Sequence, residues 1–253
     1  MIYKYDFYYS PTNSYRKIHL YIPNNYNDTN ESYPVIYFFD GNNLFFDGDS
    51  LFGMSMQLEW YLENYDKKVI VVGIEQPRGE YERVKEHCPY NIDSDMFGHI
   101  DGRGDATIRW IINELKPHID SNYRTIPFRE CTAIAGCSSA GVTAIYGITK
   151  YNRYFSKAIS ISPAIMNTKY VLSYDILNED ISPDTKVFIS YGTNEYGDNY
   201  GLRSFCINNM YEIENLLMKR NVKTYMYKNE GGDHNEIFWR NEIFSWLDFI
   251  WKS

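Results

Sequence analysis

The stretch ECTAIAGCSSAGVTAIYG, residues 130–147, decides the fold. Its first part is a run of small and apolar residues typical of a buried strand, and its last part continues as a helix-like run. Between the two stand a glycine, a cysteine and two serines, residues 136–139. Polar, nucleophilic side chains at the junction of a buried strand and a helix are typical of a turn that carries a catalytic residue.

The junction, residues 136–141, has the form G-x-S-x-A-G, close to the G-x-S-x-G nucleophile elbow. Small residues two positions before and after Ser138 allow the strand and the helix to converge without a clash. The hydroxyl is then expected at the carboxyl edge of the sheet, beside a helix amino end that favours developing negative charge. Ser138 is the candidate nucleophile, although this motif alone also fits a Ser/Gly-rich turn before an ordinary helix.

A serine hydroxyl needs a base, and histidine, with an ordinary pKa of about 6.5, is the usual one. Among the five histidines, His234 lies in a Gly-rich loop, NEGGDHNEIFW, between the last predicted strand and the last predicted helix. The acid is expected after a strand between Ser138 and His234, where Glu195 and Asp198 both occur. We predict Glu195, because it lies three residues past Gly192 and Asp198 lies six past it. Asp198 stays the alternative.

Short runs of β-branched and aromatic residues alternate with longer helical patterns along the whole chain, which is typical of a mostly parallel sheet with helices on its faces. Strands are predicted over 5–10, 17–22, 34–40, 68–74, 131–136, 157–162, 186–192 and 223–229. Helices are predicted over 51–65, 105–120, 140–151, 207–220 and 236–251. The first two strands alternate polar and apolar residues and are expected to be antiparallel edge strands. We therefore predict a single α/β domain, residues 1–253, with about eight strands.

Composition narrows the classes of partner. The 253 residues are 44% hydrophobic and carry a formal net charge of -8, which disfavours nucleic acid and anionic membrane surfaces. The four cysteines have no zinc-site or disulfide spacing, and we expect reduced thiols. We find neither a signal-peptide pattern nor an apolar run of about 18 residues. We expect a soluble, cytoplasmic protein that acts on a small molecule.

One loop, NIDSDMFGHIDGRGD, is rich in side chains that could bind a cation. They are Asp93, Asp95, His99, Asp101 and Asp105. The loop fails the EF-hand pattern because Phe97 occupies a ligand position. We interpret it as a solvated loop at the rim of a cleft, with Asp105 capping the following helix, and predict no metal, although a cation there stays open.

Several blocks, in order, resemble one family. VIYFFDGNNLFFD resembles a strand followed by D-G-Q-N-L-F, and VVGIEQPRGEYERVKEHCPY resembles V-G-I followed by R-x-x-E-x-x-P. ELKPHIDSNYRT, SISPAIM, YGTNE and GGDHNEIFW resemble its remaining blocks. From about residue 15 to the end, the chain resembles the esterase D-like group of α/β-hydrolases, which includes feruloyl and acetylxylan esterases and trilactone siderophore esterases. Departures are Asn42 for Gln, Cys137 and Ser139 in the elbow, and Ala140 where Gly is frequent.

The resemblance implies an α/β-hydrolase fold and the place of an oxyanion hole. One donor would be the backbone N–H of Ser139, and the other that of Asn42 or Asn43. Asp40 is interpreted as supporting this loop, by bonds to backbone amides. Arg83 and Glu86 are interpreted as a structural ion pair in the cleft wall, with contact to the substrate as the alternative. The family's G-T-x-E block also favours Glu195 as the acid.

The expected reaction is ester hydrolysis through an acyl-enzyme, with Ser138, His234 and Glu195 as the triad and no cofactor. We predict a carbohydrate-linked acyl or feruloyl ester as substrate. A siderophore trilactone esterase, a thioester or peptide hydrolase, and a catalytically silent α/β-hydrolase that only binds ligands are the alternatives. The acyl and alcohol groups, like the oligomeric state, stay open because loops assemble such pockets.

Overall fold

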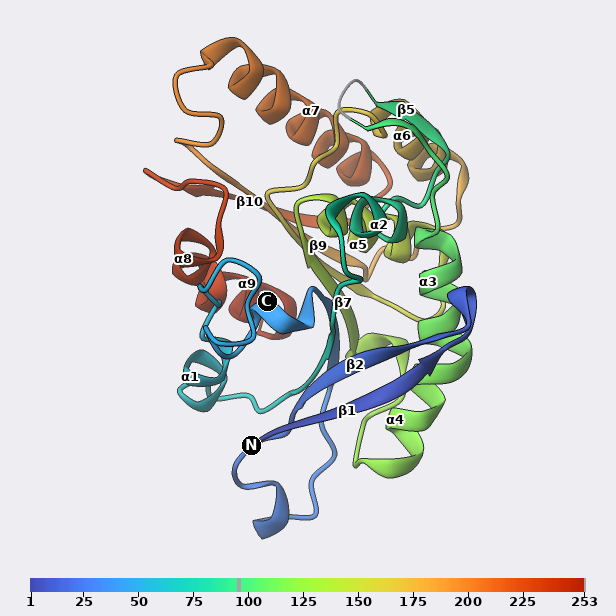
Figure 1. Ribbon diagram of the computed structural model, residues 1–253, viewed down its shortest axis with the longest axis vertical. Coiled ribbons are helices and arrows are strands. Elements are labelled where there is room, and N and C mark those ends of the chain that lie inside the picture. Colours follow the sequence, from blue (N-terminus) through green and yellow to red (C-terminus); the bar gives the residue numbers. More distant parts are fainter. Residues whose placement is uncertain (95–96, 253) are drawn as a thin grey trace.

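A single mixed sheet organises the molecule. The computed structural model describes residues 1–94 and 97–252. Eight strands pair in the order β1-β2-β4-β3-β7-β8-β9-β10 (Figure 1). They are β1 (Ile2–Tyr9), β2 (Ser14–Tyr21), β3 (Val35–Phe39), β4 (Ile70–Ile74), β7 (Thr132–Cys137), β8 (Lys157–Ile161), β9 (Lys186–Gly192) and β10 (Lys223–Asn229). β2 is antiparallel to both β1 and β4, and every pairing from β4 to β10 is parallel. The predicted α/β-hydrolase fold class, and each predicted strand, are confirmed.

Helices cover both faces of this sheet. They are α1 (Leu58–Glu63), α2 (Glu80–Glu86), α3 (Gly104–Trp110), α4 (Lys116–Asn122), α5 (Ser139–Lys150), α6 (Lys169–Asn178), α7 (Tyr200–Lys219), α8 (Glu236–Trp239) and α9 (Ile243–Trp251). α3 and α4 form one continuous helix through a π-helical segment, Ile111–Leu115. Helices α3 to α7 pack on one face, and α1, α8 and α9 pack on the other (Figure 1).

The central strands are buried on both sides because successive side chains enter different cores. In β3, Tyr37 points to the core under α3 to α7, while Ile36 and Phe38 point to the core under α1 and α9. In β7, Ile134 and Ala135 divide in the same way. This alternation explains why these strands read as continuous apolar runs.

Helix boundaries differ from the sequence-based expectation in several places. The helix predicted over 51–65 was wrong in its first half, because α1 begins only at Leu58. Leu51 and Phe52 belong to a loop and are exposed, so their apolar character reflects a surface rather than a buried helix face. Helices α2 and α6 were not predicted, and α7 begins seven residues before the predicted start at 207.

The acidic loop forms the short antiparallel hairpin of β5 (Ile92–Ser94) and β6 (Gly98–Ile100). The imidazole of His99 lies 2.8 Å from Asp93 and 3.4 Å from Asp101, and all three side chains are exposed. Asp95 lies outside the described residues. Within residues 1–94 and 97–252, no group of three or more His, Cys, Asp or Glu side chains could hold a metal ion.

The prediction that Asp105 caps the following helix was wrong. Asp105 lies inside the first turn of α3, and the residue before the helix is Arg103. The Asp105 carboxylate instead accepts hydrogen bonds from the hydroxyls of Tyr146 and Tyr151 and forms an ion pair with Arg109. It therefore ties α3 to α5 through side chains rather than satisfying the helix amino end.

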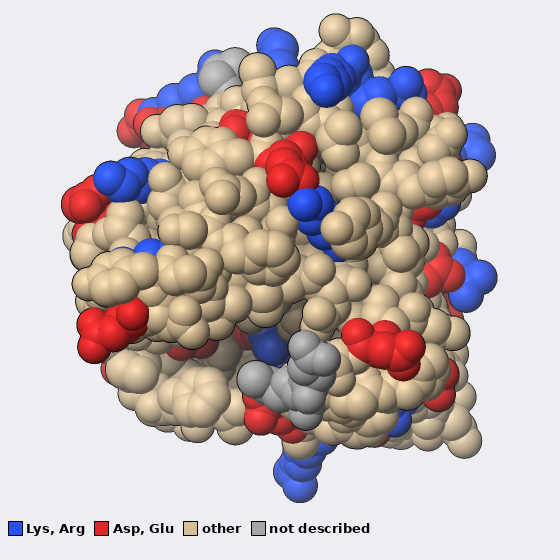
Figure 2. Space-filling model, turned by 90° about the horizontal axis from the view of Figure 1, so that it is seen from above, with Lys and Arg blue, Asp and Glu red and all other residues tan. Residues whose placement is uncertain are grey.

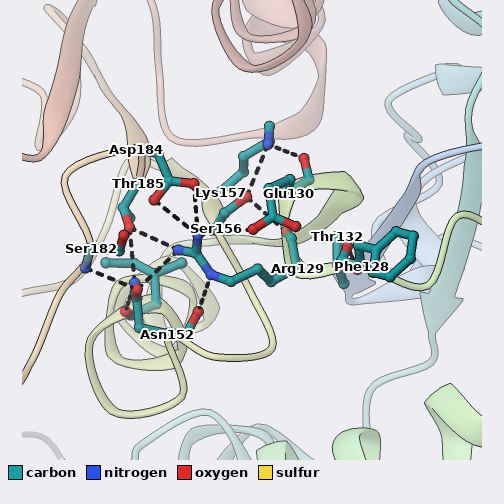
Figure 3. A network of polar contacts seen from close by, with 11 residues as sticks. Phe128, Arg129, Glu130, Thr132, Asn152, Ser156, Lys157, Ser182, Asp184 and Thr185 are labelled. Carbon is teal, nitrogen blue, oxygen red and sulfur yellow. Dashed lines mark hydrogen bonds and ion pairs between the residues drawn. The ribbon is translucent and has the colours of Figure 1, made fainter.

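A polar network closes the amino end of the sheet, opposite the ends that carry the elbow (Figure 3). Arg129, just before β7, forms an ion pair with Asp184 at 2.6 Å. It also donates hydrogen bonds to the backbone carbonyl and to the side-chain Oδ1 of Asn152. Lys157, at the start of β8, donates to the carbonyl of Glu130 and to the hydroxyl of Ser156. These contacts join the segments that enter β7, β8 and β9, so the strands are held in register from this end.

The surface shows no continuous charged area on the face drawn in Figure 2, where Lys, Arg, Asp and Glu are scattered among broad uncharged regions. That face lies at the α6 and α7 end of the molecule (Figure 1). None of the helices in the described part of the chain is long and apolar enough to cross a bilayer.

Candidate active site

The candidate site is built from loops at the carboxyl ends of neighbouring parallel strands. β3 and β7 are adjacent, with Phe38 opposite Ala135, so the turn Gly41–Asn43 and the elbow emerge side by side. β8, β9 and β10 follow in sheet order. The residues that come after these three strands are Ser162, Glu195 and His234. One sheet edge thus gathers residues that are nearly 200 positions apart in the chain.

The elbow has the strained geometry that its sequence predicts. Ser138 has φ 58° and ψ −123°, a conformation that side-chain-bearing residues rarely adopt, and helix α5 begins at the next residue. A Cβ on Gly136 would lie 2.6 Å from atoms of Ala140, so strand and helix approach too closely for any side chain there. The Ser138 backbone carbonyl accepts from the N–H groups of Gly141 and Ala164. The turn is held rigidly with its serine at the apex.

The structure brings Glu195, and not Asp198, to the imidazole of His234. Nδ1 of His234 lies 3.0 Å from Oε2 of Glu195, which is only 3% exposed. A proton on Nδ1 leaves the lone pair of Nε2 available. Asp198 is exposed, and its carboxylate forms no hydrogen bond or ion pair within the described residues. The ring of Trp239 stands edge-on to that of His234, with 5.2 Å between centroids, and limits its movement.

Glu195 is held by a set of donors. Its Oε1 accepts from the hydroxyl of Ser162 and from the backbone N–H of Gly192, while Trp239 Nε1 donates to the Ser162 hydroxyl at 3.1 Å. Burial alone would raise the pKa of Glu195, but His234, Ser162 and Gly192 together lower it below its usual value. The carboxylate therefore stays ionised and orients the imidazole. Ser162 was not among the residues predicted from the sequence, although it lies in the quoted SISPAIM block.

Ser138 and His234 face the same pocket, which has a volume of about 930 Å³. In the described residues the Ser138 hydroxyl has no hydrogen-bond partner, so it is open to this space. The hydrogen bond between a nucleophilic hydroxyl and its catalytic base often forms only when substrate is bound. The pocket wall includes the apolar side chains of Leu51, Phe52 and Trp239 as well as charged side chains.

The turn Gly41–Asn43 decides between the two candidate backbone donors from this loop. The N–H of Asn43 donates to the carbonyl of Asp40 at 2.8 Å and is therefore occupied. Within the described residues, the N–H groups of Asn42 and Ser139 have no acceptor. Asn42 also lines the pocket. Asn42 and Ser139 are thus the pair of backbone donors that the geometry leaves available for an oxyanion.

The predicted ion pair between Arg83 and Glu86 was wrong. Arg83 binds Asp40 with two hydrogen bonds, of 2.9 and 2.6 Å, and Glu86 pairs with Arg16 at 2.6 Å. The side chain of Asp40 was expected to accept hydrogen bonds from backbone amides, but within the described residues it binds Arg83 instead. Burial raises the pKa of Asp40, but Arg83 and His87 more than offset it and leave the pKa below its usual value.

Arg83 also donates to the Ser139 hydroxyl at 3.2 Å. It therefore joins the turn after β3, through Asp40, to the elbow after β7. Burial raises the pKa of Glu86 to about 7 in spite of the neighbouring Arg16.

Cys137 precedes the serine and has the more nucleophilic atom type, but its environment suppresses reactivity. It is 6% exposed and packs in the core under α1 and α9, although it also contributes to the pocket wall. Burial, with the charge of Asp40 next in size, raises its pKa well above the usual value. The thiolate that reacts as a nucleophile is therefore disfavoured.

Comparison with known proteins agrees with this architecture. "Uncharacterized protein YbbA" of Bacillus subtilis is 22% identical over 242 residues, covering 93% of this chain and 92% of that protein. An IroE-like serine hydrolase from Shewanella oneidensis has a TM-score of 0.78 at 18% identity, covering 98% of this chain and 79% of the other. A ferulic acid esterase has a TM-score of 0.68 at 14% identity, covering 99% and 97%.

The enterobactin esterase FES from Shigella flexneri has a TM-score of 0.76 at 14% identity. The match covers 100% of this chain and 59% of FES. These likenesses show the fold. The family whose model carries the description "Putative esterase" matches residues 10–250. The predicted resemblance is confirmed: the chain belongs to this family of esterases and is a carboxylic ester hydrolase.

Proposed function

We propose that the chain is a serine esterase that works through an acyl-enzyme intermediate. Ser138 attacks the ester carbonyl while Nε2 of His234 takes its proton, and Glu195 holds the imidazole by Nδ1. The N–H groups of Asn42 and Ser139 stabilise the oxyanion. His234 then protonates the leaving alcohol, and a water molecule, activated by the same base, releases the acid.

The observation that carries this proposal is the hydrogen bond of 3.0 Å between His234 and the buried, ionised Glu195, in a pocket that the strained Ser138 also lines. A histidine fixed in this way presents Nε2 as a base. A protein that only binds ligands has no need for a serine held at a positive φ or for a buried carboxylate oriented on a histidine. The geometry therefore favours catalysis over a silent scaffold.

The substrate that we propose is a carbohydrate-linked acyl or feruloyl ester. The pocket of about 930 Å³ is large enough for an aromatic acyl group with a sugar attached. The exposed side chains of Leu51 and Phe52 at its wall offer an apolar surface for such a ring. The fold-level likeness to a ferulic acid esterase supports the same class.

A siderophore trilactone is the second candidate, favoured by a different observation. Arg78 is exposed at the pocket and has no ion-pair partner among the described residues. A free guanidinium there would attract an ester that carries anionic groups such as catecholates. The likeness to the enterobactin esterase FES is consistent with this alternative.

The test is a hydrolysis screen with acetyl, feruloyl and trilactone esters, using wild type and Ser138→Ala. We expect a burst of alcohol release with the preferred class, and loss of turnover by several orders of magnitude in Ser138→Ala. The melting temperature of the variant, which keeps a small side chain at the elbow, checks its fold. Absence of any turnover across the screen would support the silent scaffold, and turnover that persists in a folded Ser138→Ala would reject the nucleophile.

A further inference from the structure

Glu236 is a buried carboxyl group at the pocket that the proposed reaction does not use. It lies two residues after His234, opens helix α8, and is 5% exposed. Burial, followed by smaller contributions, raises the pKa of its carboxyl group. A buried carboxyl with a raised pKa beside a catalytic base calls for a physical reason, because leaving it there costs desolvation energy.

The contact that Glu236 makes is with the other half of the site. Its Oε1 accepts a hydrogen bond from Nδ2 of Asn43 at 2.8 Å, across 193 positions of sequence. Both side chains are buried, so water does not compete for this bond. Ionised or protonated, a carboxyl group keeps an oxygen that accepts from this amide.

The Asn43 side chain passes this restraint on to its neighbour. Its Oδ1 accepts from Nδ2 of Asn42 at 2.8 Å, and also from the hydroxyl of Ser50 and the N–H of Leu51. These donors fix which end of the amide faces Glu236. On its far side, Oδ1 of Asn42 accepts from the N–H of Gln76 at 3.3 Å.

This chain of hydrogen bonds ends at Asn42, whose backbone N–H must be oriented toward the oxyanion. Asn42 has the free N–H that we assign to the oxyanion, and its side chain is held between Asn43 and Gln76. A donor in an oxyanion hole contributes only if it is oriented before the charge develops, and a shift of a fraction of an ångström reduces its effect. Glu236 is placed to set that orientation from the loop that also carries the base.

We propose that Glu236 is a positioning residue that couples the base loop to the oxyanion loop through Asn43. This inference rests on the proposed serine-esterase mechanism. It makes the two catalytic loops, which follow β10 and β3 on opposite sides of the elbow, a single unit. Loss of the bond leaves substrate binding in place and weakens stabilisation of the transition state.

The experiment is a double-mutant cycle measured with an ester that wild type hydrolyses. It compares Glu236→Ala, Asn43→Ala and the double variant, each with its kcat, KM and melting temperature. Glu236→Gln keeps an oxygen acceptor without the charge. Glu230→Ala is the matched control, because Glu230 lies in the same loop with its side chain 76% exposed. Glu236→Met, which fills the space without an acceptor, replaces Glu236→Ala if that variant melts below the assay temperature.

We expect Glu236→Ala to lower kcat by about 10- to 100-fold with KM nearly constant, below the loss of a whole oxyanion donor. Glu236→Gln recovers most of that rate, and Glu230→Ala behaves as wild type. The double variant is about as slow as Asn43→Ala alone, because both substitutions break the same chain of bonds.

Other outcomes overturn the inference. These are a kcat of Glu236→Ala close to wild type, a loss confined to KM, a Glu236→Gln variant as slow as Glu236→Ala, or losses that multiply in the double variant. The proposed function is judged separately, by Ser138-dependent turnover in wild type. If that turnover is present and Glu236→Ala is fully active, only the inference about Glu236 fails; if it is missing, both fail.

Discussion

Glu195 illustrates how single side chains carry the chemistry of this site. A carboxylate buried to this degree would ordinarily gain a proton, since burial disfavours its charged form. Three groups oppose this: the imidazole of His234, the hydroxyl of Ser162 and the N–H of Gly192. The lowered pKa keeps Glu195 ionised. In the proposed mechanism it would stabilise the imidazolium that forms when Ser138 loses its proton.

Substitutions of Glu195 and Asp198 distinguish which of the two is the triad acid. Glu195→Gln should lower kcat by about three to four orders of magnitude, because an amide that donates to Nδ1 selects the wrong imidazole tautomer. Asp198→Asn should be nearly silent, since the exposed Asp198 has no contact with the site. Steady-state kinetics on both variants provides the measurement. The opposite ranking would make Asp198 the triad acid.

Sequence patterns identified residues whose signal is local and missed partners that the fold brings together. Ser138 and His234 stand in recognisable turns, so they could be named from the sequence. The partner of Arg83 could not, because Asp40 lies 43 positions away, and Glu86 reaches Arg16 over 70 positions. Glu236 had only its nearness to His234 as a signal, and its bond to Asn43 depends on how the strands are ordered.

Among the elements, strands were predicted better than helices. A strand buried on both faces is a short apolar run with clear ends, and β9 matches its predicted limits. The edge strand β10, which is only partly buried, also matches its predicted limits. Helix α6 was not predicted because it lacks the polar face expected of a surface helix. Its exposed residues include Tyr170, Val171 and Tyr174. The false start at residue 51 has the same cause, since Leu51 and Phe52 form part of the pocket wall.

Close packing of two elements sets the second prediction. A Cβ on Gly41 would lie 2.4 Å from the backbone carbon of Gly73 in β4, and backbone on both sides leaves no flexible atom to move. Gly41→Ala should therefore lower the free energy of unfolding by about 1–3 kcal/mol, as overpacking does, and also reduce kcat by displacing the oxyanion turn. Urea denaturation and ester kinetics measure the two effects.

Gly48→Ala is the control for this substitution, because a Cβ there meets no atom within 4 Å. It should leave both stability and kcat near wild type. Equal stability of the two variants would show that the turn can relax, and would remove the steric reason for glycine at Gly41.

At the scale of the whole molecule, the two ends of the sheet have separate tasks. Arg129 and its partners hold the starts of the strands (Figure 3). The candidate site lies at the carboxyl ends of the strands. Polar contacts also run through the interior behind the triad. Ser162 donates to Glu195 and its N–H lies 3.3 Å from the hydroxyl of Ser190, which donates to Glu242 at 2.9 Å. Sequence alone gave no indication of this line, since Glu242 occurs in a segment expected to be ordinary amphipathic helix.

Glu242 makes the stability of the molecule depend on pH. It is 0% exposed, its Oε2 has no hydrogen-bond partner within residues 1–94 and 97–252, and burial raises its pKa well above the usual value. The folded state therefore keeps a proton that the unfolded chain releases near pH 4.5. Between that pH and the raised pKa the native state binds more protons, so its stability falls as pH rises, by about 1.4 kcal/mol per pH unit for one group.

Glu242→Gln removes this titration and retains an acceptor for Ser190, with an amide in place of the unpartnered oxygen. The free energy of unfolding of the variant, relative to wild type at the same pH, should therefore increase as the pH rises from 5 toward the raised pKa of Glu242. Urea denaturation at each pH measures it, and taking the difference cancels the other titrating groups, whose contributions are common to both proteins. Glu31→Gln, at an exposed glutamate, should show no such trend. A difference for Glu242→Gln that is constant with pH would mean that Glu242 is ionised in the folded protein, and the interior behind the triad would then have to hold a second negative charge close to Glu195.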